Sequence, residues 1–276
     1  MTILDEIAEK TKSRVETAKK TAPFDQVRKK AIALADKSGS REWGVGSVKE
    51  ASRLPFEKAV AEPGLSFICE VKKASPSKGV IAEDFPYLQI ALDYESAGAS
   101  AISVLTEPDY FLGSDQYLKE IADAVAIPTL RKDFVIDPYQ IYEAKILGAK
   151  AVLLICALLD GPTLAEYIKT ADETGLSALV EIHNEAEAEQ AVRAGAKIIG
   201  INNRDLKTFR VDLAVTADLR SLLPAGVLAV AESGIKSPED IRAVSAIGID
   251  AVLIGESMMR AADKKQFLAE LKAGEN

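Results

Sequence analysis

Charged side chains stand at the ends of several apolar runs of this chain. The run LSFIC leads directly into Glu70 and Lys72, and the runs IPTL and SALV lead into Lys132 and Glu181. Burying such charges unpaired would cost several kcal/mol or more, whereas two lysines and two glutamates can compensate each other. Ammonium and carboxylate groups that are held together can also donate and remove protons. We therefore interpret these four residues as the general acids and bases of an enzyme.

The positions of these residues within their runs place them on one face. Side chains alternate along a strand, so Glu70 and Lys72 point together, while Phe67, Cys69 and Val71 point the other way. The same count pairs the other polar residues with small or apolar neighbours: Lys132 with Leu130, Glu181 with Leu179, Asn202 with Gly200, and Ser233 with Ala231. A single charge after a strand is usually solvated, but several in matching phase favour a catalytic site.

Asn202, Ser233 and His183 also have plainer interpretations. Asn202 could simply order the loop NNRD, and Ser233 in ESGI could be a turn residue or a helix cap. Their matching phase favours a place for both in the catalytic site. His183 is expected to be an ordinary hydrogen-bonded histidine in a loop.

Eight apolar runs, spaced by about 25 residues, are the strands that must position this site. They are residues 65–71, 97–105, 127–133, 147–155, 176–182, 194–201, 227–233 and 247–255. Four of them repeat a glycine, a small polar step and a β-branched segment, which suits a helix C-cap followed by a strand buried on both faces. Asp137-Pro138 and Ser237-Pro238 are helix start signals.

Eight strands alternating with helices predict an α/β fold, the TIM (β/α)8 barrel. An open Rossmann-type sheet would normally carry a GxGxxG turn after its first strand, and this chain has none there. We predict a single domain, with residues 1–62 forming an N-terminal helical extension packed on a barrel of residues 63–276. In such a barrel the carboxyl ends of the strands face the active site, which gathers the charged residues at one mouth.

Glycine-containing turns after the seventh and eighth strands predict a phosphate site. Gly234 follows Ser233, and Gly255 precedes Glu256, so backbone amides can approach an anion where barrels usually bind phosphate. Ser75, in the turn SPS, is expected to assist. The carboxylate of Glu256 would repel phosphate, so we expect its side chain to turn away while its backbone N–H contributes.

An apolar slot for an aromatic group is expected beside the charged residues. The candidates are Phe111, Phe134, Pro76 and Leu153, although plain core packing explains a phenylalanine about equally well. Arg204 is expected to order the loop after the sixth strand, close to the substrate.

Composition narrows the class of partner. The net charge of −8 argues against a general nucleic-acid or membrane-surface partner, so any anion site must be local. Cys69 and Cys156 lie within apolar runs, and the chain has a single histidine, which argues against a disulfide framework or a zinc site. The charged N-terminus is neither a signal peptide nor a membrane span, and we expect a cytoplasmic enzyme.

Seven motifs, in their order along the chain, resemble the indole-3-glycerol phosphate synthase family of tryptophan biosynthesis: EVKKASPSKG, LTEPDYFLGS, LRKDFVIDPYQI, LVEIHN, IGINNRDL, AESGI and VLIGES. The resemblance covers the whole predicted barrel and the preceding PFEKAVAEPG. It implies a carboxy-lyase that closes the indole ring of 1-(2-carboxyphenylamino)-1-deoxyribulose 5-phosphate, with loss of carbon dioxide and water. It implies no metal and no cofactor, and its partner is a phosphorylated small molecule.

The resemblance also implies a role for each charged residue. Lys132 resembles the general acid that protonates the ribulose carbonyl, and Lys72 resembles the lysine that holds the anthranilate carboxylate. Glu181 and Glu70 resemble the carboxylates of proton removal and dehydration, with the division of steps left open. The supporting polar residues are Asn202 and Ser233. We expect a monomer.

Three other functions compete with this one. Phosphoribosylanthranilate isomerase is a barrel with a similar phosphate site, but it favours a Cys/Asp acid–base pair, and Cys69 is out of phase with Glu70. A Schiff-base aldolase would use a buried lysine to form an imine with its substrate. A barrel that only binds a ligand would have no need of charges at matching strand ends.

Overall fold

A closed barrel of parallel strands forms the centre of the computed structural model, which describes residues 2–37 and 53–275. The strand order around the barrel is β1-β10-β9-β8-β7-β6-β5-β4. The barrel strands are β1 (Ser66–Val71), β4 (Ala101–Leu105), β5 (Thr129–Lys132), β6 (Ala151–Ile155), β7 (Ser177–Ile182), β8 (Ile198–Asn202), β9 (Leu228–Glu232) and β10 (Ala251–Ile254). Each lies within or overlaps one predicted run, so the predicted eight-stranded barrel is confirmed.

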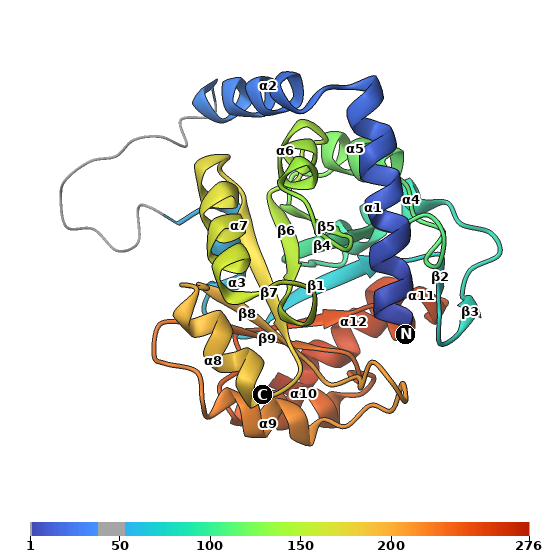
Figure 1. Ribbon diagram of the computed structural model, residues 1–276. Coiled ribbons are helices and arrows are strands. Elements are labelled where there is room, and N and C mark those ends of the chain that lie inside the picture. Colours follow the sequence, from blue (N-terminus) through green and yellow to red (C-terminus); the bar gives the residue numbers. More distant parts are fainter. Residues whose placement is uncertain (1, 38–52, 276) are drawn as a thin grey trace.

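Helices follow the strands and form the outer layer of the barrel (Figure 1). They are α4 (Tyr87–Ser96), α5 (Asp115–Ala124), α6 (Pro138–Ile146), α7 (Gly161–Glu173), α8 (Glu185–Arg193), α9 (Ala214–Arg220), α10 (Pro238–Ala246), α11 (Glu256–Arg260) and α12 (Lys264–Lys272), with 3₁₀ turns η1 (Cys156–Leu158) and η2 (Ala273–Glu275). The side chains of Asp137 and Ser237 cap α6 and α10, as the sequence predicts. Gly98 and Gly148 follow α4 and α6 with φ of 87° and 95°, conformations that suit the expected C-cap glycines.

A short hairpin, which the sequence did not predict, follows the first barrel strand. Its strands β2 (Ala74–Ser75) and β3 (Gly79–Val80) are antiparallel and place the SPS turn beside the barrel mouth. Ala74 N–H donates to Phe111 O over 3.2 Å, which ties the hairpin to the loop after β4.

Two apolar layers cover the two faces of the barrel wall. Side chains such as Ile68, Leu130 and Leu179 form the layer inside the barrel. Phe67 and Cys69 belong to the layer between the strands and the helices. This is the alternation that the sequence predicts for β1, and it leaves the inner face for the polar residues at the strand ends.

Helix α3 (Pro55–Val60) closes the amino-terminal end of the barrel. Phe56 and Val60 are fully buried in the inner layer, together with Ile68. Ser66 Oγ, at the start of β1, donates to Ala59 O over 2.7 Å. Within the described residues, apolar side chains therefore plug this end of the barrel.

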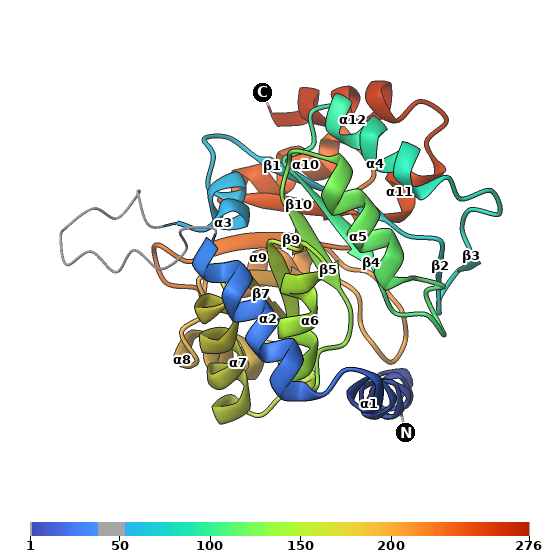
Figure 2. The ribbon, with the colours of Figure 1, turned by 90° about the horizontal axis from the view of Figure 1, so that it is seen from above.

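Helices α1 (Ile3–Thr21) and α2 (Phe24–Lys37) lie outside the barrel. A capping box at Thr2 begins α1, and α2 packs against α6. Figures 1 and 2 show α1 beside the end of the barrel that lies opposite α3. Residues 38–52 of the predicted extension lie outside the described residues, and the division of the chain at residue 62 stays a prediction. Among the helices of residues 2–37 and 53–275, none is both long and apolar enough to cross a bilayer.

Candidate active site

A cavity of about 650 Å³ opens at the carboxyl ends of the barrel strands. The predicted acid–base and supporting residues that line it are Glu70, Lys72, Lys132, Glu181, Asn202 and Ser233. The predicted substrate-binding residues that line it are Ser75, Pro76, Phe111, Phe134, Leu153, Arg204, Gly234, Gly255 and Glu256. The structure therefore brings together every residue that the sequence analysis singled out for the site.

Lys132 is the centre of the charged cluster. It ends β5, and its Nζ lies 3.2 Å from Glu181 Oε2 at β7 and 2.5 Å from Glu232 Oε2 at β9. The Lys132 side chain is 13% exposed, and the Glu181 and Glu232 side chains are 6% and 3% exposed. An ammonium between two nearly dry carboxylates keeps its charge, so Lys132 can polarise or protonate an oxygen in the cavity.

Lys72 forms a second ion pair, with Glu70 on the same face of β1. The pair lies against the backbone of Gly255 at the end of β10, and a Cβ at that position would collide with both side chains. The glycine that the sequence analysis assigned to phosphate approach therefore also makes room for this pair. Lys72 is 16% exposed and Glu70 only 4%, so the ammonium is the more accessible partner for a substrate.

Glu232 is a site residue that the sequence reasoning missed. It ends β9 and faces inward, in phase with Val230 and next to Lys132. The phase predicted for this strand was wrong, because Ala231 packs under the helices. Ser233 reaches the cavity after the strand has ended, where its φ of 66° turns the chain. Counting by twos from Val230 finds Glu232, but the alanines on either side of it make the two phases look alike.

Burial and neighbouring charges shift the pKa values of this cluster in opposite directions. Burial alone would lower the pKa of Lys132, but Glu232 and Glu181 raise it above its usual value. Burial alone would raise the pKa of Glu181, but Lys132 and His183 hold it well below its usual value. Burial, with the charges of Glu181 and Glu70, raises the pKa of Glu232 to about 7 against the pull of Lys132. Near neutral pH, Glu232 can therefore exchange a proton while Glu181 stays ionised.

Apolar side chains line another part of the cavity. The rings of Phe111 and Phe134 lie with their centroids 5.9 Å apart, and Leu153 and Pro76 line the same cavity. Helix α1 adds three apolar residues that the sequence analysis did not assign to the site, Ile3, Leu4 and Ile7. This surface suits a flat aromatic group whose polar substituents reach the charged cluster.

The turns after β9 and β10, which the sequence analysis expects to bind phosphate, line the cavity through Gly234, Gly255 and Glu256. Gly234 has a φ of 98°, which favours glycine, and Gly255 precedes α11. The Glu256 carboxylate, which was expected to turn away from an anion, lies 3.1 Å from Arg260 Nε and 3.7 Å from Lys78 Nζ. These two cations offset its charge, so the cavity can still accept a phosphate there.

Arg204 holds the loop after β8, as the sequence analysis expected. Its backbone N–H donates to Asn202 Oδ1 over 3.0 Å, and its guanidinium donates to Phe209 O over 3.3 Å. It also forms an isolated β-bridge with Val211. Asn202 therefore shapes this loop through its side-chain oxygen and lines the cavity at the same time.

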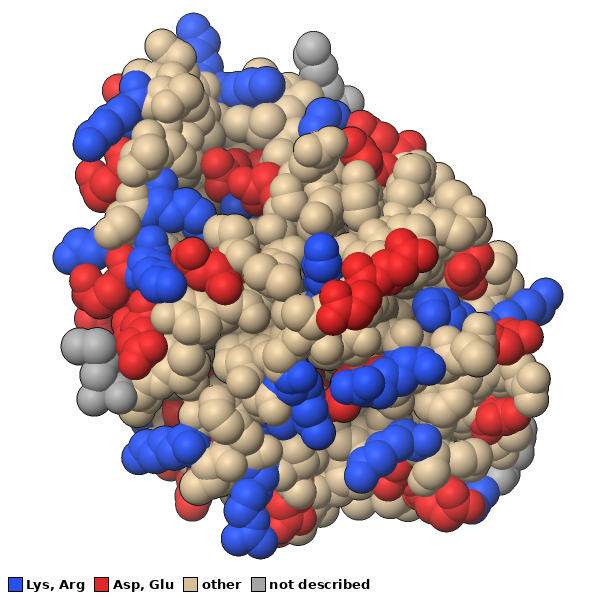
Figure 3. Space-filling view, turned by 90° about the vertical axis from the view of Figure 1, so that its right-hand side faces the viewer, with Lys and Arg blue, Asp and Glu red and all other residues tan. Residues whose placement is uncertain are grey.

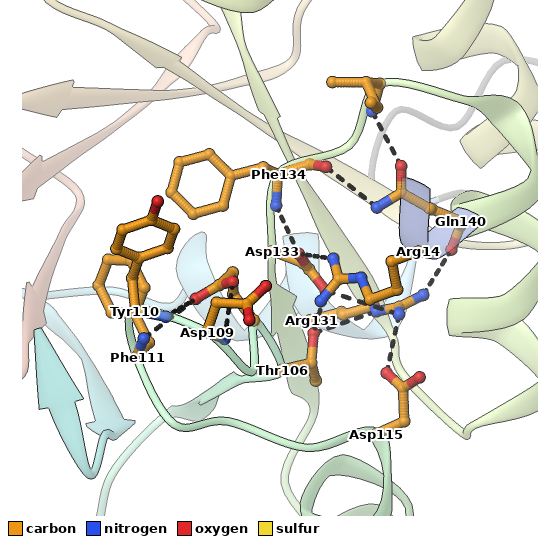
Figure 4. Close-up of polar contacts among 12 residues, drawn as sticks. Arg14, Thr106, Asp109, Tyr110, Phe111, Asp115, Arg131, Asp133, Phe134 and Gln140 are labelled. Carbon is orange, nitrogen blue, oxygen red and sulfur yellow. Dashed lines mark hydrogen bonds and ion pairs between the residues drawn. The ribbon is translucent and has the colours of Figure 1, made fainter. Parts of the chain in front are cut away.

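Polar contacts behind the cavity fix the residues on either side of Asp133 (Figure 4). Asp133 follows Lys132 and precedes Phe134 in the sequence, and its side chain is buried. It accepts from the backbone N–H of Phe134 over 2.8 Å. Thr106 Oγ1 and Arg14 Nη2 of α1 each donate to it over 2.6 Å. The end of β5 is therefore attached both to the residue that follows β4 and to the N-terminal helix.

Glu107 holds the other phenylalanine in the same way. One of its oxygens accepts from the backbone N–H of Asp109 over 2.9 Å, and the other accepts from Tyr110 and Phe111 over 2.7 and 3.0 Å. Each aromatic residue of the slot is thus fixed by a buried carboxylate that accepts from its backbone N–H.

Two rival functions fit this site poorly. Cys69 is buried in the outer layer, and burial raises the pKa of its thiol to about 12, so it cannot serve as an acid or base in the cavity. Lys132 is held as an ammonium by its carboxylates, and imine formation requires a free amine. Within residues 2–37 and 53–275, no group of three or more His, Cys, Asp and Glu side chains is arranged to hold a metal ion.

Figure 3 shows the face of the molecule on which α1 lies, coloured by charge. Lysine and arginine side chains alternate there with aspartate and glutamate side chains, and neither sign gathers into one broad patch. An anionic substrate would therefore be recognised inside the cavity and not by the surrounding surface.

Comparisons with known proteins agree on one family. The model of the indole-3-glycerol phosphate synthase family matches residues 4–271. The indole-3-glycerol phosphate synthase of Ruminiclostridium cellulolyticum is 56% identical over 270 residues, which cover 98% of each chain. That of Endomicrobium trichonymphae is 50% identical over 270 residues, 98% of this chain and 99% of its own. The crystal structure of 3-hexulose-6-phosphate synthase from Salmonella typhimurium matches with a TM-score of 0.62 at 16% identity, covering 76% of this chain and 98% of its own, which shows the fold alone.

Proposed function

This chain belongs to the indole-3-glycerol phosphate synthase family, and we propose that the charged residues of its barrel mouth carry out the family's ring closure by proton transfer. The enzyme converts 1-(2-carboxyphenylamino)-1-deoxyribulose 5-phosphate into indole-3-glycerol phosphate, carbon dioxide and water. The observation that carries the proposed mechanism is the Lys132 ammonium, held between Glu181 and Glu232 on the wall of one cavity.

Ring closure joins the aryl carbon that bears the carboxylate to the ketone carbon of the ribulose. As this bond forms, the carbonyl electron pair moves to oxygen, and Lys132 donates a proton to that oxygen. Glu232, with its pKa raised to about 7, then returns a proton to Lys132. A charged acid at this position stabilises the developing alkoxide more than the ground-state ketone, which is what accelerates the step.

Decarboxylation and dehydration complete the indole ring. Loss of carbon dioxide leaves its electron pair to the ring system, so this chemistry asks for no electron sink. Lys72, more exposed than its partner Glu70, binds the substrate carboxylate until it leaves. Glu181, which stays ionised, then removes a proton, while the Glu70–Lys72 pair supplies the proton that departs with the hydroxyl group.

The remaining residues orient the substrate. The aromatic ring occupies the slot of Phe111 and Phe134, flanked by Pro76 and Leu153. The polar groups that meet the phosphate are Ser75, the turns at Gly234 and Gly255, and the backbone of Glu256. The side chains that meet the hydroxyl groups are Asn202 and Ser233, with Arg204 ordering the adjacent loop. We expect the enzyme to work as a monomer.

A turnover assay tests the mechanism directly. The purified chain should convert the substrate to a product with indole fluorescence and release one carbon dioxide for each product molecule. Glu181→Gln keeps the shape of the side chain but removes its basicity, and it should lower kcat about 10²–10⁴-fold, the usual contribution of a general base. Glu181→Gln turning over at the wild-type rate would remove Glu181 from the mechanism.

A further inference from the structure

His183, the only histidine of the chain, lies between two carboxylates just beyond β7. Its Nε2 is 3.3 Å from Glu181 Oε1, and its Nδ1 is 3.1 Å from Glu187 Oε2 on α8. The His183 side chain is 12% exposed, so water competes weakly for its nitrogens. His183 is not among the side chains that line the cavity, and any effect on the reaction must pass through Glu181.

The two neighbouring carboxylates decide the protonation state of the ring. A neutral imidazole has one N–H and one lone pair, and its lone pair would face a carboxylate oxygen here. The doubly protonated ring donates from Nδ1 to Glu187 and also places its positive charge beside Glu181, where Nε2 lies at ion-pair distance without forming a hydrogen bond. Burial alone would lower the pKa of His183, but these two carboxylates raise it to about 10.

Glu187 is held in place independently of the ring. Its Oε2 accepts from the backbone N–H of His183 over 2.8 Å, and its Oε1 accepts from Asn184 Nδ2 over 2.8 Å. It lies in the first turn of α8, where the positive end of the helix dipole favours a carboxylate. The imidazolium therefore has a fixed anionic support on the side away from the cavity.

Glu181 has a cation at each of its oxygens. Lys132 Nζ lies 3.2 Å from Oε2, and His183 Nε2 lies 3.3 Å from Oε1. When Lys132 turns to a substrate oxygen during ring closure, His183 is the cation that stays with Glu181. We propose that His183, supported by Glu187, is a positioning residue that keeps Glu181 oriented and ionised throughout turnover. This inference rests on the proposed role of Glu181 as the base.

The other groups packed around the ring do not oppose this arrangement. Turn η1 brings Cys156, whose Sγ lies 3.8 Å from Glu187 O; burial raises the pKa of this thiol to about 12, so it is neutral. Strand β8 brings the uncharged Asn202, which helps to lower the pKa of Glu181. Strand β5 brings Lys132, which contacts the other oxygen of Glu181.

Nitrogen-15 NMR of the untagged protein measures the ring directly, because a single histidine needs no assignment. Both ring nitrogens should carry protons at pH 8, well above the ordinary histidine pKa of about 6.5. In Glu187→Gln the ring should lose a proton at lower pH than in the wild-type protein, since one of its two anions is gone. A wild-type ring that is neutral at pH 7 would overturn the proposal.

Steady-state kinetics then separates positioning from simple packing. His183→Asn should lower kcat about tenfold and change KM less than about twofold, because the loss acts on the base and not on substrate contacts. The decrease of kcat on the acidic side of its pH profile, the acid limb, should move to higher pH, since Glu181 loses a cation that lowers its pKa. Glu187→Gln should move the limb in the same direction by less.

Glu189→Gln is the matched control for Glu187→Gln. It makes the same charge change on the same helix, but Glu189 is 60% exposed and pairs with Arg193 on the surface. It should leave kcat and the pH profile unchanged.

The outcomes are distinguishable. If kcat falls at the same low pH in His183→Asn and Glu187→Gln as in the wild-type enzyme, the proposal is overturned. A lowered Tm without any shift of this pH dependence also overturns it, because it shows a purely structural role. If His183→Asn does not fold, Glu187→Gln decides with the same two measurements. An active Glu181→Gln refutes Glu181 as the base. An inactive Glu181→Gln beside a normal His183→Asn refutes only the positioning role.

Discussion

Arg131 and Lys132 are consecutive residues of β5, and they place a buried cation and a partly buried cation on opposite faces of one strand. Lys132 lines the cavity, whereas Arg131 is surrounded by side chains beside helices α5 and α6 (Figure 4). Both lie among carboxylates, so burial and charge alone do not distinguish a catalytic cluster from a structural one. The distinction lies in how fully the partners are satisfied and in whether the cation can release a proton.

The Arg131 cluster is closely paired. Its guanidinium contacts Thr106 Oγ1 at 3.3 Å, Gln140 O at 3.0 Å, Asp115 Oδ1 at 2.7 Å and Glu143 Oε2 at 2.8 Å. Arginine keeps its proton at every pH at which a protein of this kind folds. The cluster can therefore hold β4, β5, α5 and α6 together, but it cannot take part in proton transfer.

The Lys132 cluster is incomplete. Glu232 Oε2 contacts Lys132, but Glu232 Oε1 is buried without a hydrogen-bond partner. Leaving a buried acceptor unpaired costs about 1–3 kcal/mol, so a donor that reaches Glu232 Oε1 would be bound favourably. A substrate hydroxyl group can complete the cluster, and the raised pKa of Glu232 lets it titrate near neutral pH. Incompleteness and a group that titrates near neutrality are what mark the catalytic face.

Lys132→Ala should produce the largest effect of all. Removing a general acid lowers kcat about 10²–10⁴-fold, and KM should change little, because the ammonium acts mainly where charge develops on the carbonyl oxygen. Indole fluorescence with substrate in excess measures both constants. Lys132→Arg keeps the charge but is a very poor proton donor. A near wild-type rate in Lys132→Arg would exclude proton donation and leave only electrostatic polarisation.

Lys72→Ala is the comparison within the same cavity. Its proposed carboxylate contact exists already in the ground state, so this variant should raise KM noticeably as well as lower kcat. Equal KM values for Lys72→Ala and the wild-type enzyme would show that Lys72 does not bind the substrate carboxylate.

The place of Lys132 on the inner face of β5 could be predicted from the sequence, whereas the contacts of Arg131 on the outer face could not. Lys132 follows an apolar run in the same phase as Leu130, and strand alternation is a local property that a single sequence displays. The partners of Arg131 come from α5, α6 and the residue after β4, and no local sequence pattern predicts such long-range contacts. The contribution of α1 to the cavity is also a long-range contact, so the sequence did not predict it.

Arg131→Met should destabilise the fold more than it harms catalysis. Removing the cation leaves Asp133 and Glu143 without it, and breaking a buried pair in this way costs about 3–5 kcal/mol. Urea unfolding measures the loss, and kcat of the folded fraction should stay within about threefold of wild type. Asp115→Asn is the control, since Asp115 is 46% exposed and its loss should cost less than about 1 kcal/mol. A stable but inactive Arg131→Met would contradict the view that Arg131 is structural and Lys132 catalytic.

Glu232→Gln tests the titrating member of the catalytic cluster. The glutamine fills the same space and cannot ionise, so kcat should fall about tenfold, and the change of rate with pH near 7 should flatten. Rates from pH 5.5 to 9 would measure this. An unchanged pH profile would mean that another group titrates there.

Glu232 also shows why the sequence placed part of the site wrongly. In LAVAES the small alanines fit either face of the wall, so the phase of β9 was ambiguous. In the structure Glu232 points into the barrel, and Gly200 on β8 leaves the space for its carboxylate, because a Cβ at Gly200 would collide with it. A glycine on a neighbouring strand thus makes room for a charge, which is a relation between strands that no single run contains.

Arg14→Gln should have the smallest effect on stability and activity. Arg14 joins α1, which lines the cavity, to Asp133 beside the Arg131 cluster. Asp133 keeps Arg131 and Thr106, so losing the Arg14 contact should cost only about 1.5 kcal/mol in the free energy of unfolding. The looser α1 carries Ile3, Leu4 and Ile7 on the cavity wall, so KM should rise a few-fold with kcat unchanged. Lys10→Gln, whose pair with Asp109 is about half exposed on the same helix, should change neither constant.

The pH dependence of this effect has a definite sign. Burial would raise the pKa of Asp133, but Arg14 and Arg131 lower it below the ordinary value of 3.8. A carboxyl group whose pKa is lower in the folded state stabilises the fold above its unfolded pKa, and this contribution is lost as pH falls through the folded pKa. Arg14→Gln forfeits part of that contribution, so its stability should differ most from wild type near pH 7 and less as pH falls below about 4. Urea unfolding at both pH values measures the difference, and a gap that widens on acidification would show that Arg14 does not act through the ionised Asp133.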